Sequence, residues 1–226
     1  MRQGYEYERQ QNNTAAFQCY EKAALAGNAY GMYNTANMYL QGKGTPRDYG
    51  MALKWYLEAA KLGVGDAMFN MGKMFELGAI EQDYKLAADC YAMAVRAGCF
   101  EALYALGFFY KHSYGVEQDY QEARKLFEKA AEGNDSNAMI HLGFMYENGM
   151  GIGKDDVKAA EWYRKSAEAG NRDGMFNLGL MYEEGQGVEK NETVAAELYK
   201  KAAELGDLDS KKRLQDLVDN GYYPRG

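Results

Sequence analysis

Proline, histidine and cysteine are all scarce in this sequence. Of 226 residues, 2 are proline, 2 are histidine and 3 are cysteine. So few prolines argue against a disordered, proline-rich tail. Cys19, Cys90 and Cys99 are odd in number and follow no repeated pair spacing, so we expect buried structural thiols and no disulfide framework.

Two further absences exclude classes of partner. There is no run of about 18 apolar residues, so we expect no direct membrane insertion. The net charge is −7 and the only basic run is Lys211, Lys212 and Arg213, which excludes the positive footprint of a nucleic-acid binder. The polar first residues do not resemble a signal peptide, so we expect the chain as given in the cytoplasm, or in the periplasm or outside the cell if a signal has been removed.

The sequence offers few groups for chemistry. His112 and His141 have no Cys, His or carboxylate neighbour at a metal-ligand spacing, and no serine lies in a nucleophile-elbow motif. Glu183 and Glu184 are adjacent, but neighbouring residues on a helix point to different faces. We therefore predict no catalytic residue, no metal site and no cofactor, and a protein that is not an enzyme.

A repeat of about 36 residues organises the chain. Buried-type aromatic residues recur at spacings of 36, 35, 36, 36 and 36, and each stands four residues after an alanine and three before another small residue. This spacing predicts one face of an α-helix. The aromatic positions are Tyr20, Tyr56, Tyr91, Phe127, Tyr163 and Tyr199.

A second helical pattern follows each of these segments, as in "AMFNMGKMF" and "AMIHLGFMY". It places Gly72, Gly107, Gly143 and Gly179 in mid-helix, where glycine costs about 1 kcal/mol relative to alanine. We expect an aromatic ring of the next helix to lie against the exposed backbone and to offset this cost. Between the helices, Asp48, Asp83, Asp119, Asp155 and Asn191 are expected N-caps, and Gly27, Gly63, Gly98, Gly133, Gly170 and Gly206 are expected left-handed C-terminal residues.

The run "AMIHLGFMYENGMGIGKDDVKAAEWYRKSAEAG" and its copy "GMFNLGLMYEEGQGVEKNETVAAELYKKAAELG" resemble the Sel-1-like repeat family, a relative of the tetratricopeptide repeats. The resemblance covers almost the whole chain and implies an all-α, α–α superhelix (solenoid) of antiparallel helical hairpins. The first helix of each hairpin would line a concave surface, and the second would lie outside.

We accordingly predict about twelve helices in a single domain over 1–226. Full repeats are expected near 28–62, 64–97, 99–133, 135–169 and 171–205, with an unpaired helix over 14–26 and a polar capping helix over 208–220. An unpaired first helix suggests an array that begins partway through a repeat and is cut from a longer one.

A glycine-rich stretch, "NGMGIGKD", resembles a phosphate-binding loop. Its copies in the other repeats identify it as the turn between the two helices of a hairpin, ended by the N-cap Asp155. Of its glycines, only Gly153 is not explained by the repeat.

Helical spacing selects the residues that would line the concave face. The ten candidates, which we call the first-helix row, are Tyr33, Asn37, Phe69, Lys73, Tyr104, Phe108, Ile140, Phe144, Phe176 and Leu180. The aromatic members could instead pack between neighbouring helices. Acidic residues surround the row and are called the acidic rim: Asp66, Glu76, Glu101, Glu147, Asp173 and Glu183.

These residues predict a scaffold or adaptor that binds a peptide or helix of another protein, with apolar anchors and basic flanks. Two alternatives stay open. One is an enzyme or enzyme inhibitor of the type of the β-lactam-binding relatives, although those carry a regular cysteine pair in each repeat. The other is a purely structural spacer. The oligomeric state is not predicted.

Overall fold

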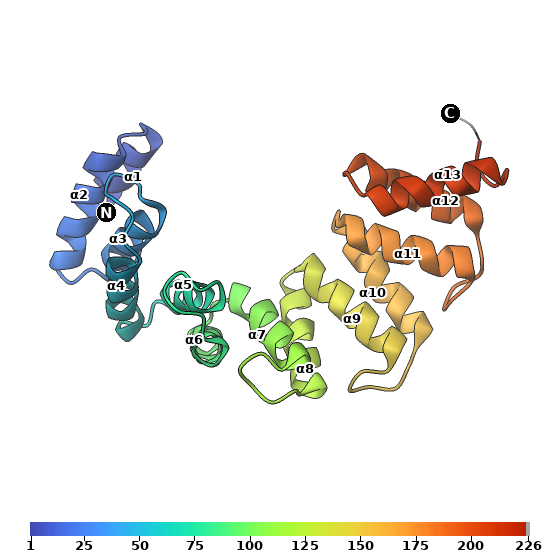
Figure 1. Ribbon diagram of the computed structural model, residues 1–226, viewed down its shortest axis with the longest axis horizontal. Helices are drawn as coiled ribbons and strands as arrows, with labels where there is room; N and C mark the ends of the chain where they lie inside the picture. The colour runs from blue at the N-terminus through green and yellow to red at the C-terminus, as the bar shows by residue number, and fades with distance from the viewer. Residues whose placement is uncertain (225–226) are drawn as a thin grey trace. The chain divides into compact units, whose positions relative to one another are not determined.

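A computed structural model of the chain describes residues 1–224 and is all-α (Figure 1). Within these residues it has thirteen α-helices. They are α1 Arg2–Arg9, α2 Asn13–Leu25, α3 Ala29–Gln41, α4 Tyr49–Lys61, α5 Gly65–Glu76, α6 Tyr84–Arg96, α7 Glu101–His112, α8 Tyr120–Glu132, α9 Ser136–Asn148, α10 Asp156–Glu168, α11 Arg172–Glu184, α12 Glu192–Glu204 and α13 Leu208–Asp219.

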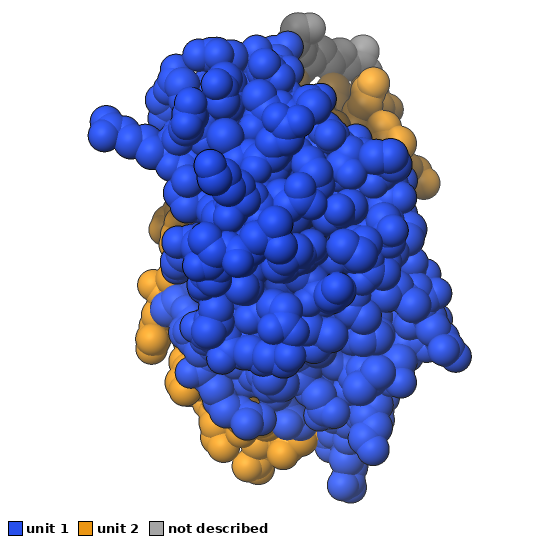
Figure 2. Space-filling view, turned by 90° about the vertical axis from the view of Figure 1, so that its left-hand side faces the viewer, with its two compact units in different colours: residues 1–118 blue, residues 119–226 orange. Residues whose placement is uncertain are grey.

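The chain forms two compact units, residues 1–118 and residues 119–226, coloured blue and orange in Figure 2. In the first unit each helix from α1 to α7 packs on the next one in the sequence, and in the second unit the same holds from α8 to α13. Sequential packing of this kind is expected when short turns join antiparallel helices. We call the odd-numbered helices first helices and the even-numbered ones second helices.

The helix ends agree with the expected punctuation except at one position. The side chains of all five predicted aspartate and asparagine N-caps accept a backbone N–H of the first helical turn. The prediction of a left-handed Gly133 was wrong, because its φ is −82° and the left-handed residue is Asn134, with φ 66°. Asparagine tolerates this conformation better than most residues because its short side chain can bond locally.

The mid-helix glycines lie where an aromatic ring meets the backbone. A Cβ atom built on Gly72 would lie 2.6 Å from Cε1 of Tyr91, and Gly143 and Gly179 have the same relation to Tyr163 and Tyr199. All three rings are almost completely buried. The expected close approach is confirmed at these three glycines, and burial of a whole tyrosine ring explains why glycine is kept in these helices despite its low propensity.

The helix over 14–26 is not unpaired, and this corrects the prediction. α2 packs against α1, which lies only a few residues before it. The segment that forms α1, RQGYEYER, is short and polar, and it lacks the alanine and aliphatic residues that mark the other helices. Its signal is Gly4, because a Cβ there would lie 2.5 Å from Cε1 of Tyr20, the same relation that Gly72, Gly143 and Gly179 have to their tyrosines.

Ser113 occupies a left-handed position that is glycine in other repeats. Its φ is 59°, and the equivalent residues Gly42, Gly149 and Gly185 also have positive φ. We expect Ser113→Gly to raise the free energy of unfolding by about 0.5–1 kcal/mol, because the Cβ penalty disappears. Urea unfolding measures this, and Gly149→Ser should change stability in the opposite direction. A change of the same sign in both variants would contradict the conclusion that the left-handed conformation of Ser113 is strained.

Candidate peptide-binding surface

A tyrosine–glutamate hydrogen bond recurs in four repeats. The hydroxyl of Tyr163 donates to Glu147 at 2.7 Å, and that of Tyr199 donates to Glu183 at 2.6 Å. Tyr20 donates to Glu8, and Tyr91 to Glu76, in the same way. Each glutamate stands four residues after its mid-helix glycine, so one turn of the first helix supplies both the space for the ring and the acceptor for its hydroxyl.

Two repeats depart from this pattern: one keeps the tyrosine but has Leu40 at the glutamate position, and the other replaces both members of the pair. Tyr56 donates to Oδ1 of Asn37, and Nδ2 of Asn70 lies 3.3 Å from both of these oxygen atoms. This cluster joins α3, α4 and α5. In the other repeat, Lys111 stands at the glutamate position and Phe127 at the tyrosine position, so the hydroxyl and the carboxylate are absent together. Burial lowers the pKa of Lys111.

Three aromatic members of the first-helix row, Tyr33, Phe69 and Phe176, are partly buried against these tyrosines. Ring centroids lie 6.0 Å apart for Tyr33 and Tyr56, 5.6 Å for Phe69 and Tyr91, and 5.8 Å for Phe176 and Tyr199. Their exposure is intermediate, as it is for Tyr104, Phe108, Asn37, Ile140 and Leu180. The row therefore packs on the second helices and also offers aromatic surface to solvent, which combines the two alternatives raised by the sequence.

Lys73 and Phe144 are the exposed members of the row. The ammonium group of Lys73 lies 5.7 Å from the ring centroid of Phe69, close enough for a cation–π contact. In the second unit the row borders a hollow of 410 Å³ lined by Phe176, Asp209, Lys212, Arg213 and Asp216. This hollow gives a partner side chain room to enter beside Phe176.

An aromatic ladder extends the row at the end of α7, and the sequence did not predict it. The ring of His112 lies 4.2 Å from Phe108 and 5.7 Å from Tyr114, and Tyr114 stacks on Tyr84 at 5.0 Å. Tyr84 and Tyr114 are 37% and 38% exposed. A signal was present in the repeat, because Tyr114 replaces Lys43, Ala79, Met150 and Gln186 of the other turns.

Both histidines have structural surroundings. Burial, and then the charge of Lys111, lower the pKa of His112, so the imidazole is neutral at pH 7. The ring of His141 stacks on Phe127 at 4.9 Å and 13°. Each ring therefore serves as a flat aromatic surface in the packing of the first helices.

The acidic rim divides into two groups. Glu76, Glu147 and Glu183 are half-buried acceptors of the tyrosine bonds described above, and Glu183 also pairs with Arg213 at 3.1 Å. The remaining rim residues, Asp66, Glu101 and Asp173, are exposed. Glutamates held from beneath by a tyrosine are fixed in position, whereas the exposed aspartates and Glu101 can adjust to a ligand.

Two of the exposed rim residues lie beside a buried thiol. Ligand atoms of Asp66, Cys99 and Glu101 all lie within 4.8 Å of one another. The backbone N–H of Ala102 donates to the Cys99 sulfur, and its thiol donates to Glu101 at 3.4 Å. Burial is the main cause that raises the pKa of this thiol to about 12. Cys99 is thus a buried, protonated thiol just before α7, whose N-cap is Phe100, as expected for a structural thiol.

None of the helices in the part of the chain that the structure describes is both long and apolar enough to cross a membrane.

Comparison with known proteins identifies the repeat. The Sel1 repeat profile matches residues 3–28, 29–64, 65–99, 100–135, 136–171 and 172–207. The first match includes α1 and thereby agrees with the pairing of α1 and α2. Protein sel-1 homolog 2 of Rattus norvegicus is 38% identical over 79 residues, which are 34% of this chain and 12% of that protein.

Solved structures extend the similarity to nearly the whole chain. A protective antigen present in uropathogenic Escherichia coli strains, with an SLR fold, has a TM-score of 0.92 and 32% identity, and the match covers 96% of this chain and 48% of the antigen. A Sel1 repeat protein from Oxalobacter formigenes has a TM-score of 0.87 and 28% identity over 98% of this chain and 91% of that one. An immunity protein of Pseudomonas aeruginosa shares the fold at 20% identity and a TM-score of 0.55 over 99% of this chain and 88% of its own.

The chain thus spans a small part of the sel-1 homolog and about half of the antigen. Its six repeats, its all-α solenoid fold and its glycine–tyrosine packing lead to one conclusion. The chain belongs to the Sel1 repeat family, whose α-solenoid is a protein-interaction fold.

Proposed function

We propose that this chain is a non-enzymatic adaptor that holds a segment of another protein against its first-helix row. The observation that carries the proposal is a set of half-exposed aromatic rings on first helices, namely Tyr33 of α3, Phe69 of α5 and Phe176 of α11, each of which packs on a buried tyrosine of a second helix. Aromatic rings that are rigidly held give a large contact area at a low entropic cost. The concave face predicted for the first helices is the surface proposed to receive the segment.

The charges favour a partner with basic flanks on the first unit. Asp66 and Glu101 are exposed, and Glu76 is fixed by Tyr91. In the second unit Arg213 pairs with Glu183 and Arg172 with Asp173, which reduces the negative field there. We therefore expect the acidic rim of the first unit to orient the partner and accelerate its association.

Removing three rings of the row tests the proposal. We expect Phe69→Ala, Tyr104→Ala and Phe108→Ala together to weaken binding of the partner by about 100-fold or more, because buried aromatic anchors carry much of the affinity of an interface. The partner is first isolated from native cell extract and identified by mass spectrometry, and its affinity is then measured with purified proteins.

A matched variant controls for loss of apolar surface. Leu57 and Met93 lie on the second helices α4 and α6 and are 41% and 45% exposed. Leu57→Ala with Met93→Ala should leave the affinity unchanged, and circular dichroism should show both variants folded. Equal weakening by both variants, or full affinity of a folded triple variant, would overturn the proposal and favour a spacer.

A further inference from the structure

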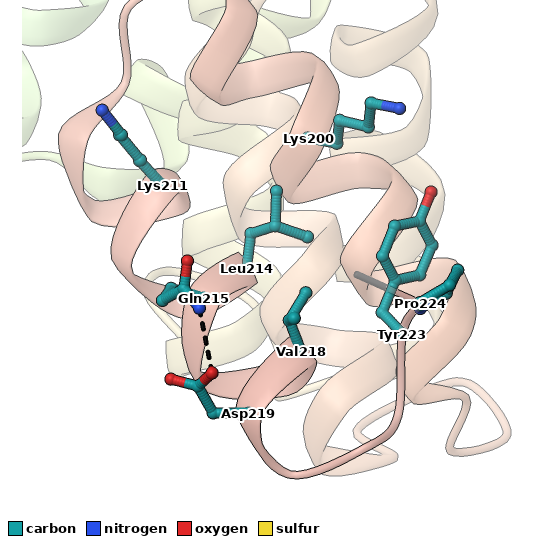
Figure 3. A pocket seen from close by; sticks show the side chains of 8 residues that line it. All are labelled: Lys200, Lys211, Leu214, Gln215, Val218, Asp219, Tyr223 and Pro224. Atoms are coloured by element: carbon teal, nitrogen blue, oxygen red, sulfur yellow. Dashed lines mark hydrogen bonds between the residues drawn. The ribbon is translucent and has the colours of Figure 1, made fainter. Parts of the chain in front are cut away.

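The second unit has a hollow of 630 Å³ beside α13 (Figure 3). Its walls come from α12, from α13 and from the segment after α13. The lining residues are Lys200, Lys211, Leu214, Gln215, Val218, Asp219, Tyr223 and Pro224. Figure 3 shows Leu214 and Val218 on one side of α13, between Lys211 and Tyr223.

The hollow lies on the face that other first helices use to pack on their second helix. Counting back 36 and 72 residues from Leu214 and Gln215 leads to Leu178 and Gly179 of α11 and to Leu142 and Gly143 of α9. In those hairpins the glycine receives the ring of Tyr199 or Tyr163. α13 packs on α12, and within the described residues no fourteenth helix follows to cover this face.

Two residues make this face of α13 more polar than the same face of α11 and α9. Lys211 stands where α11 and α9 have Met175 and Met139, and Gln215 stands where they have glycine. Leu214 and Val218 keep an apolar floor of intermediate exposure, and Tyr223 packs against the same cluster as Leu214. The result is an apolar strip with lysines on its walls instead of a plain polar cap.

We propose that this hollow binds an acidic amphipathic helix of another protein, in the place that a second helix occupies elsewhere in the repeats. Lys200 and Lys211 would meet carboxylates of that helix, while Leu214 and Val218 take its aliphatic residues. The one acidic lining residue, Asp219, accepts a hydrogen bond from Gln215 at 3.0 Å. This surface is different from the first-helix row, and binding to it does not depend on the row.

Gln215 argues against a Sel1-type helix as the occupant. Such a helix brings a tyrosine ring to a point where even a Cβ atom on the glycine would lie 2.6 Å away. Gln215 places a side chain at the position of that glycine, and this side chain is exposed and hydrogen-bonded to Asp219. A helix with a small or aliphatic residue at this point therefore fits better than one that brings a tyrosine ring.

Synthetic peptides test the proposal on the purified full chain. The probe is a fluorescent peptide of alanine and leucine with the 13-residue length of α12, with leucines on one face and glutamates beside them. We expect saturable binding by fluorescence anisotropy, and about tenfold weaker binding to Lys200→Glu with Lys211→Glu. Lys129→Glu with Lys201→Glu, which changes the charge equally at exposed lysines of the second unit outside this hollow, should alter the affinity by less than about twofold.

Gln215→Gly supplies a gain of function that misfolding cannot mimic. It should raise the affinity for a peptide with tyrosine in place of the central leucine by about tenfold, and change the affinity for the leucine peptide little.

Three results would overturn the proposal. One is the absence of saturable binding of the glutamate peptide, and another is equal weakening by both lysine pairs. The third is a dimer in sedimentation that Lys200→Glu with Lys211→Glu abolishes and the control pair keeps, since that result would assign the hollow to a second copy.

Discussion

Gly143→Ala should lower the free energy of unfolding by about 3 kcal/mol, although alanine is the better helix former by about 1 kcal/mol. The new Cβ would lie 2.6 Å from Cε1 of Tyr163, so the fully buried ring has to move. Its movement disturbs both the packing and the hydrogen bond to Glu147. Urea unfolding followed by circular dichroism measures the change.

Gly153→Ala is the matched control in the same repeat. Gly153 has no atom within 4 Å of a built Cβ and no positive φ, so alanine there should leave stability unchanged or raise it slightly. In a Tyr163→Ala background the cost of Gly143→Ala should also vanish, because the ring is gone. A similar cost in both backgrounds would show that ring contact is not the reason for this glycine.

A steep loss of stability is expected above pH 10. Burial is the first cause that raises the pKa of Tyr20, Tyr56, Tyr91, Tyr163 and Tyr199 far above the usual value of 10.0. The folded state keeps five protons that the unfolded chain loses above pH 10, so their contribution to stability is complete below that pH and declines above it. Above pH 10 each tyrosine lowers the free energy of unfolding by about 1.4 kcal/mol per pH unit, and all five together lower it by about 7 kcal/mol per pH unit.

A loss of that size is comparable with the whole stability of a typical domain, so the chain should unfold within about one or two pH units above pH 10. The tyrosinate absorbance of these five rings should appear together with the loss of helical circular dichroism. Tyr163→Phe should reduce the slope of stability against pH by about one fifth. Ionisation of all the tyrosines near pH 10 with the helices intact would contradict the packing described for these rings.

The repeat made most of the fold predictable, and the exceptions have local causes. The positions of glycine and tyrosine predicted the hairpins, because the two residues that touch lie close together in the sequence and the same pair recurs in successive repeats. Helix α1 was not predicted, because its residues are mostly polar and Gly4 is the one residue that matches the repeat pattern of a first helix. The left-handed conformation of Asn134 was not predicted, because Gly133 stands one residue earlier in its turn than the glycine of the other copies.

The candidate site was less predictable than the fold. Helical period selected the first-helix row, but it did not show that the Asn37 side chain is held by Tyr56 and Asn70. It also did not show that Glu76, Glu147 and Glu183 hold tyrosine hydroxyls as well as forming the rim. These bonds join residues on different helices, and their geometry follows from the packing of the hairpin as a whole.

Position-specific photo-crosslinking tests the central claim most directly. A photoreactive phenylalanine analogue is placed singly at Phe69 and Phe108 of the first-helix row and at Leu57 and Met93 of the second helices, in the native cell. We predict that one partner is crosslinked from both positions of the row and from neither second-helix position. Crosslinking of that partner from Leu57 or Met93, and not from the row, would contradict the proposed binding surface.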